Sequence, residues 1–143
     1  AFEAKRAIED GADEVDMVIN IQAVKNAEWD VVTEDIRTVK KACGETVLKV
    51  IIETDYLTKE EIVEACKCAI AAKADFVKTS TGFVNGGVGA KAEDVKLMYE
   101  TVKDAGLRVK ASGGIRDRQA AEAMVAAGAS SLGTSSGIKI VEG

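Results

Sequence analysis

Phe76-Val77-Lys78-Thr79-Ser80-Thr81-Gly82 is the stretch that decides the fold. An apolar run typical of a β-strand carries a lysine and then opens into a loop of hydroxyl residues and glycine. Burial of an ammonium group is costly unless the group is paired or loses its proton. Lys78 therefore either lies solvated at the end of a strand or is placed there for chemistry.

The same pattern recurs in the neighbouring strand-like runs. Lys49 lies in Leu48–Ile52 and Lys110 in Val109–Gly114, while the run that precedes both carries Asp16. One such lysine is most simply a charged group at the wet end of a strand. Three lysines in successive strands, after an aspartate in the strand before them, favour an amine-based active site.

The composition is that of an ordinary globular protein. The chain has 143 residues, 47% of them hydrophobic, and a net charge of -5. We interpret it as a single domain over residues 1–143, long enough to bury a substantial core. No basic block is present that would neutralise phosphates, so nucleic-acid binding is not expected. No apolar run approaches the ~18 residues that a membrane span needs.

The absence of histidine restricts the possible chemistry. It removes every Ser-His or Cys-His nucleophile and the commonest metal ligand. Acid-base steps must then use Asp, Glu, Lys, Tyr or water. Cys43, Cys66 and Cys68 are odd in number and lack the paired spacing of a zinc site, so we expect free thiols in a reducing cytoplasm.

The chain reads as a repeat of strand, loop and helix, which gives a parallel sheet covered by helices. A dinucleotide fold would need a G-x-G-x-x-G turn after its first strand, and the chain has none. Polar and glycine residues instead follow every strand, as in the TIM (β/α)8 barrel. We therefore expect an α/β fold, a partial TIM-type barrel of about five parallel strands. The expected strands are 14–19, 47–53, 75–79, 108–111 and 130–133, and the expected helices are 1–10, 28–42, 58–72, 92–105 and 117–127, with 20–26 a connection and a short terminal helix after Gly137.

Parallel strands would project Asp16 and the three lysines into one interior near the carboxyl-end mouth. Lowering a lysine pKa from ~10.4 to ~7–8 takes about 3–4 kcal/mol, which burial and a second cation can supply. Lys110, on the strand next to Lys78, is placed to be that cation, and Asp16 can move protons. A neutral amine can attack a carbonyl to form an imine, which permits carbon-carbon cleavage.

Two further loops point to a phosphate group. Ser112–Arg116 and Gly133–Gly137 follow the last two strands and are rich in glycine and serine. Glycines let backbone N–H groups approach an anion, and the loops after the last two strands of such barrels often bind phosphate. Either loop alone could equally be a tight turn, but the pair in this position favours an anion site.

The segments Asp13–Asn20, Leu48–Thr54, Phe76–Gly82 and Val109–Arg116 together resemble the deoxyribose-phosphate aldolase family. The resemblance implies a class I aldolase that cleaves 2-deoxy-D-ribose 5-phosphate to D-glyceraldehyde 3-phosphate and acetaldehyde, without a metal or other cofactor. It implies that Lys78 forms the Schiff base, that Lys110 favours its neutral amine, that Asp16 relays protons and that Lys49 is a supporting polar residue. The implied phosphate-site residues are Gly82, Gly113, Gly114, Gly133, Ser135 and Ser136.

Two departures from the family accompany this resemblance. The chain begins at the helix that would follow the third strand of the barrel, so strands four to eight are expected, and Lys73 replaces the usual glycine at the end of a helix. Besides its phosphorylated sugar, the chain is expected to need a partner, either further copies of itself or the missing part of the barrel. The alternative is an inactive, self-associating partial barrel that at most binds phosphorylated ligands.

Overall fold

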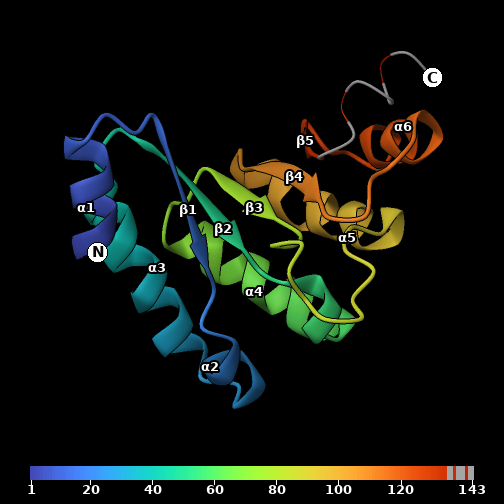
Figure 1. The fold of residues 1–143 in the computed structure, drawn as a ribbon. Coiled ribbons are helices and arrows are strands. Elements are labelled where there is room, and N and C mark those ends of the chain that lie inside the picture. The colour runs from blue at the N-terminus through green and yellow to red at the C-terminus, as the bar shows by residue number, and fades with distance from the viewer. Residues whose placement is uncertain (135–136, 138–140, 142–143) are drawn as a thin grey trace.

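One parallel sheet of five strands forms the centre of the computed structural model, which describes residues 1–134, 137 and 141 (Figure 1). The strands follow one another in the sheet in the order of the sequence, from β1 to β5. Ser135, Ser136 and most of the expected terminal helix lie outside the described residues. The strands are β1 (Glu14–Val18), β2 (Val47–Ile51), β3 (Phe76–Lys78), β4 (Arg108–Ser112) and β5 (Ser131–Gly133).

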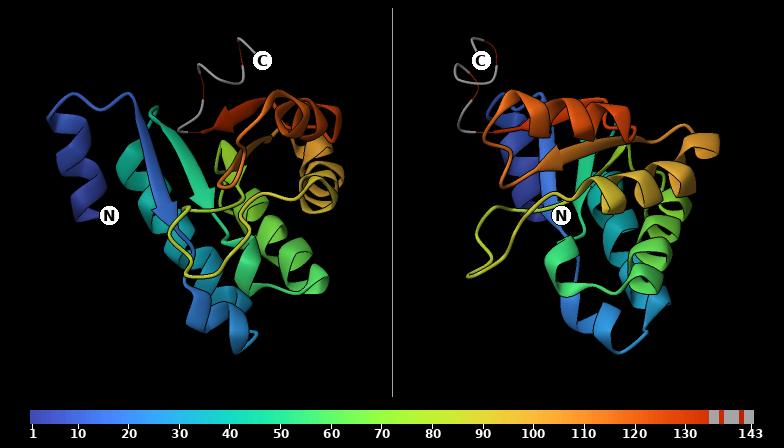
Figure 2. Two further views of the ribbon diagram at one scale, coloured as in Figure 1. Left: turned by 45° about the vertical axis from the view of Figure 1, so that its right-hand side comes forward. Right: turned by 90° about the vertical axis from the view of Figure 1, so that its right-hand side faces the viewer.

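Helix α1 precedes the first strand, and the other helices connect successive strands. The long helices pack side by side, α1 on α3, α3 on α4, α4 on α5 and α5 on α6. Parallel crossovers of one hand that always advance in the same direction place α3, α4, α5 and α6 on the same face of the sheet (Figure 2). The α-helices are α1 (Phe2–Glu9), α2 (Ile21–Lys25), α3 (Trp29–Cys43), α4 (Lys59–Ala71), α5 (Ala92–Val102) and α6 (Arg118–Ala126), and the 3-10 turns are η1 (Thr54–Tyr56) and η2 (Lys103–Ala105). The strand order and the single helical layer confirm the expected α/β architecture.

The hydrophobic core lies between the sheet and this helical layer. Alternate strand residues point to opposite faces, so one set from each strand meets the helices. Val50, Val77 and Val109 belong to that set and are fully buried, as is Met98 of α5. The other set, which includes the three strand lysines, points away from the helices. We call the face of the sheet that it forms the inner face.

Side-chain caps define the starts of α4 and α2. Thr58 and Glu61 form a capping box at the start of α4, which agrees with the helix expected from residue 58. Residues 20–26 were expected to be a connection, but they contain α2. The Asn20 side chain accepts a hydrogen bond from the Ala23 N–H at 3.0 Å and so caps this short helix.

The connection between β2 and α4 also differs from the expectation. The strand was expected to reach Glu53 but ends at Ile51, because Glu53 adopts a left-handed backbone with φ of 58° and leads into η1. Lys73, the residue that replaces the expected glycine, is likewise left-handed, with φ of 60°. A side chain at such a position strains the backbone by roughly 1–2 kcal/mol. Of the two, only Glu53 lies at the carboxyl end of a strand, where the polar residues gather.

Candidate active site

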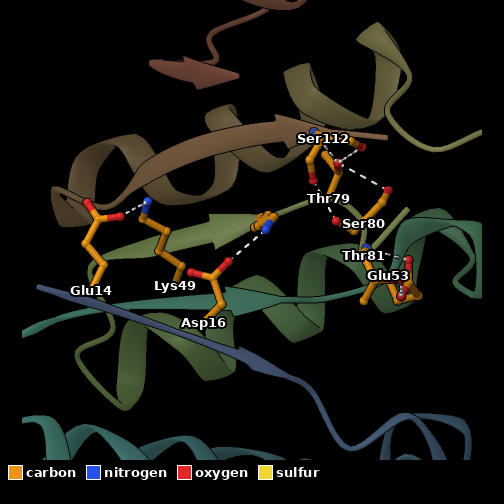
Figure 3. A network of polar contacts seen from close by, with 9 residues as sticks. Glu14, Asp16, Lys49, Glu53, Thr79, Ser80, Thr81 and Ser112 are labelled. Atoms are coloured by element: carbon orange, nitrogen blue, oxygen red, sulfur yellow. Dashed lines mark hydrogen bonds and ion pairs between the residues drawn. The ribbon is translucent and has the colours of Figure 1, made fainter. Parts of the chain in front are cut away.

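The inner face of the sheet carries acidic side chains on β1 and amines on β2, β3 and β4. Figure 3 shows Glu14, Asp16 and Lys49 of this set. Asp16 of β1 is the register neighbour of Lys49 on β2, and Lys78 of β3 is the register neighbour of Lys110 on β4. Register neighbours of a parallel sheet point to the same side. The four residues singled out in the sequence therefore share one face.

Lys78 and Asp16 form an ion pair across this face. The Lys78 Nζ donates a hydrogen bond to the Asp16 Oδ2 at 2.7 Å. The Lys78 side chain is only 14% exposed, whereas that of Asp16 is 36% exposed. The amine is thus sheltered but still within reach of a small molecule, and the carboxylate lies where it can exchange protons with both the amine and solvent.

Lys49 lies one pleat nearer the amino ends of the strands than Lys78 and Lys110. Its register partner on β3 is Phe76, two residues before Lys78. Its Nζ donates to the Glu14 Oε2 at 2.6 Å and lies 5.0 Å from the centre of the Phe76 ring. Lys49 is 5% exposed. The sequence predicts that Lys49 projects near the mouth together with Lys78. The structure instead places Lys49 as a paired charge nearer the amino ends of the strands.

Of the three strand lysines, Lys110 is the one that forms no ion pair with a carboxylate of residues 1–134. Burial lowers the pKa of Lys110, and repulsion from the ammonium groups of Lys49 and Lys78 lowers it further, against opposing attraction from Asp16 and Glu14. From the sequence, Lys110 is predicted to be the cation that acts on Lys78. The structure adds the reciprocal effect, in which Lys78 favours the neutral amine of Lys110.

A buried hydroxyl network fixes the carboxyl ends of β3 and β4 beside these amines. Thr79 Oγ1 donates to the Ser112 carbonyl and accepts from the Ser112 N–H, both at 3.0 Å. Ser112 Oγ in turn donates to the Ser80 carbonyl at 2.6 Å. Thr79 directly follows Lys78, and Ser112 lies two residues after Lys110. The network therefore holds the two lysine-bearing strands in register at the mouth.

A cavity of about 380 Å³ opens beyond these strand ends. Three of the glycines implied to bind phosphate, Gly82, Gly113 and Gly114, line it. Within the described chain their backbone N–H groups donate to no acceptor, so three donors are free at its wall. The full lining is Asp55, Gly82, Val84, Gly87, Val88, Gly89, Gly113, Gly114 and Arg116.

Gly133 does not line this cavity. A Cβ atom on it would lie 3.2 Å from the Lys110 Cε and 3.0 Å from the Ser112 Cβ. The absent side chain thus leaves room for Lys110, and the structure gives Gly133 a place beside the amine. Ser135 and Ser136 fall outside the described residues, so their placement remains an expectation.

The two charged residues of the cavity wall, Asp55 and Arg116, were not predicted from the sequence. Arg116 belongs to the quoted Ser112–Arg116 loop but was given no role, and it forms no ion pair with any carboxylate of residues 1–134. The signal that could have identified it is a cationic side chain two residues after the glycine pair. Asp55 had no such signal, because its partners lie more than thirty residues away in the sequence.

The described residues contain no cluster of three or more histidine, cysteine, aspartate or glutamate side chains arranged to hold a metal ion. None of their helices combines the length and the apolar character required to cross a membrane.

Known aldolases match the whole of this chain in sequence. It is 60% identical over 143 residues to the deoxyribose-phosphate aldolase of Finegoldia magna, covering all of this chain and 66% of that protein. It is 58% identical over 144 residues to the deoxyribose-phosphate aldolase of Lactococcus lactis subsp. cremoris, covering all of this chain and 64% of that protein. The chain therefore spans just under two thirds of the length of these curated relatives.

Solved structures extend the match to the fold. The aldolase QR15 superposes with a TM-score of 0.90 and 46% identity, over 99% of this chain and 62% of that one. The deoxyribose phosphate aldolase of Aeropyrum pernix superposes with a TM-score of 0.82 and 34% identity, over 99% of this chain and 58% of that one. These neighbours are TIM-barrel aldolases, so the five-stranded sheet corresponds to part of such a barrel. The DeoC/LacD family aldolase model matches residues 1–143, and the chain belongs to that family.

Proposed function

We propose that this protein is a class I aldolase that cleaves 2-deoxy-D-ribose 5-phosphate through an imine on Lys78. The observation that carries the proposal is the Lys78–Asp16 pair, sheltered on the inner face next to Lys110. The relatives from Finegoldia magna and Lactococcus lactis are themselves named deoxyribose-phosphate aldolases. The proposal extends that activity to this chain.

The chemistry begins at the aldehyde carbon of the open-chain sugar. The neutral Lys78 amine attacks this carbon, and the resulting carbinolamine loses water to give a protonated imine. A base removes the proton of the C3 hydroxyl, the bond between C2 and C3 breaks, and its electrons move toward the imine nitrogen. Glyceraldehyde 3-phosphate leaves, the enamine is protonated at C2, and water releases acetaldehyde and restores the amine.

Asp16 and Lys110 are the groups that we assign to proton movement around this amine. Asp16 Oδ2 lies 2.7 Å from the Lys78 Nζ and can hold the proton that the amine gives up. Lys110 has a lowered pKa, so a larger share of it is neutral than of an ordinary lysine, and it can act as a base. Lys49 remains paired with Glu14 beneath them and contributes positive charge to the face.

The cavity at the ends of β3 and β4 is the proposed phosphate site. The free N–H groups of Gly82, Gly113 and Gly114 supply hydrogen-bond donors, and Arg116 supplies a guanidinium without a carboxylate partner among residues 1–134. Arginine and backbone amides are the groups that proteins use for phosphate esters. A phosphate held here would place the opposite end of a five-carbon sugar toward the mouth of the sheet.

Borohydride trapping with acetaldehyde tests the proposal. We expect an acetaldehyde-dependent ethyl group on Lys78, located by peptide mass spectrometry. Lys78→Arg should abolish the label with little change in the circular dichroism spectrum, since arginine keeps the charge but cannot lose its proton in this range. Labelling that persists in Lys78→Arg would refute the assignment of Lys78.

The inactive partial barrel predicts a different result, namely binding of inorganic phosphate without any acetaldehyde-dependent label.

We also propose that the protein associates with further copies of itself or with a partner that completes the barrel. Light scattering at micromolar concentration measures this directly, and a monodisperse monomer would contradict self-association.

A further inference from the structure

The connection between β2 and α4 supplies two carboxylates to the loop that follows β3. Glu53 is 4% exposed, and its carboxylate accepts hydrogen bonds from the Thr81 N–H at 3.1 Å and the Thr81 hydroxyl at 2.7 Å (Figure 3). The Thr81 hydroxyl in turn accepts from the Phe83 N–H at 3.1 Å. Glu53 thus fixes the start of the loop.

Asp55 fixes the other end of the same loop. Its Oδ1 accepts from the Val88 N–H at 3.2 Å and its Oδ2 accepts from the Gly89 N–H at 2.9 Å. Immediately afterwards the Ala90 N–H donates to the Gly113 carbonyl at 3.0 Å. The end of the loop is therefore held between η1 and the glycine pair that follows β4.

Neither carboxylate is explained by the imine chemistry, and neither forms an ion pair within residues 1–134. A carboxylate that lines a cavity for an anion would repel that anion if its oxygens were free. Both oxygens of Asp55 are instead engaged by backbone N–H groups, which partly offset its charge. A role in holding the loop in one conformation would explain why carboxylates are present so close to a site for an anion.

We propose that Glu53 and Asp55 are positioning residues that hold the 82–89 loop in the form that binds the phosphate group. The inference rests on the proposed function and deepens it. Four of the nine residues that line the cavity belong to the part of this loop from Val84 to Gly89, and Gly82 begins the loop. Release of the Asp55 contacts would let that wall move away from Gly113, Gly114 and Arg116, which supply the donors.

Asp55→Ala is the principal variant, because Asp55 is partly exposed and contacts the loop only through its carboxylate oxygens. We expect hydrogen exchange of the Val88 and Gly89 amides to accelerate at least about tenfold, since both lose their acceptor. We expect the dissociation constant for inorganic phosphate, measured by calorimetry, to rise about tenfold, or about 1.4 kcal/mol. The matched control is Asp104→Ala, which removes an exposed carboxylate from η2, near the amino end of β4.

A kinetic comparison separates positioning from a general structural role. Asp55→Ala should raise KM for 2-deoxyribose 5-phosphate about tenfold and should change kcat/KM for 2-deoxyribose, which has no phosphate, by a much smaller factor. A structural defect would slow both substrates alike. Asp55→Asn keeps one acceptor oxygen and should fall between the parent and Asp55→Ala, which provides a second variant if the alanine form does not fold.

The acetaldehyde label distinguishes the two proposals, because the imine with acetaldehyde needs no phosphate site. If the parent chain acquires no label, the aldolase proposal is refuted. The amide exchange and phosphate affinity would still test whether Glu53 and Asp55 hold the loop in position. If the phosphate affinity and the amide exchange of Asp55→Ala equal those of Asp104→Ala, the positioning inference is wrong.

Discussion

Replacement of Gly89 by alanine tests the contact between the loops that follow β3 and β4. A Cβ atom on Gly89 would lie 2.5 Å from the backbone carbon and oxygen of Gly113, so the two loops would have to separate by roughly 1 Å to reach ordinary contact. Gly86 is the matched control in the same loop. Both glycines have φ of +74°, but a Cβ on Gly86 would meet nothing within 4 Å.

The difference between the two variants isolates the contact. An alanine with positive φ costs about 1–2 kcal/mol at either position. Gly89→Ala adds a collision with backbone, for which overpacking costs of about 1–3 kcal/mol are typical. We therefore expect Gly86→Ala to lose about 1–2 kcal/mol of unfolding free energy and Gly89→Ala about 2–5 kcal/mol.

Urea unfolding gives the two free energies, and calorimetry gives the affinity for inorganic phosphate. Gly89 lines the cavity and Gly86 does not, so only Gly89→Ala should also weaken phosphate binding, by about tenfold or more. Equal losses of stability in the two variants would show that the loops are not in contact. An unchanged phosphate affinity in Gly89→Ala would show that their separation does not matter for the site.

Two further variants test the charges of the inner face. The pKa of Lys110 is lowered from 10.5 in the folded state, chiefly by burial, so the unfolded chain binds more protons between the lowered value and 10.5 and stability rises with pH across that window. Lys110→Met should therefore be more stable than the parent at pH 7 and lose this advantage as the pH approaches 10.5; urea unfolding at several pH values measures the difference, and a constant difference would contradict the reasoning. Glu14→Ala should lose about 1–2 kcal/mol of unfolding free energy, because it leaves the buried Lys49 ammonium unpaired. The loss should be smaller than for a fully buried pair, because the Glu14 side chain is 54% exposed. Thermal or urea unfolding of Glu14→Ala and of the double variant with Lys49→Met should show that the second change restores stability, and a fully stable Glu14→Ala would contradict the pairing.

The strands and most helices could be predicted from the sequence because their signals are local. The apolar runs around Val50, Val77 and Val109 identify buried strands, and Thr58 with Glu61 marks the start of a helix. The shared face of Asp16 and the three lysines followed from the strand period once the strands were taken as parallel.

The features that were missed depend on contacts between distant residues or on one side-chain bond. Asn20 caps α2 through a single hydrogen bond, which a reading of periodicity does not detect. The depth of Lys49 depends on the register of β2 against β3, which places it beside Phe76. Asp55 acquires its role from backbone groups 33 and 34 residues away, for which no motif exists.

The separation of acids and amines onto different strands has a consequence for how the sheet assembles. Because strand side chains alternate, a slip of β1 by two residues that puts Met17 where Val15 stands and Ile19 where Met17 stands would still present apolar side chains to the helices, and hydrophobic burial alone would barely oppose it. The same slip puts Val18 where Asp16 stands and leaves Lys78 without its carboxylate. The ion pair between Lys78 and Asp16 thus disfavours an alignment of β1 that the core would accept, and two residues proposed for catalysis also guide the pairing of the strands that carry them.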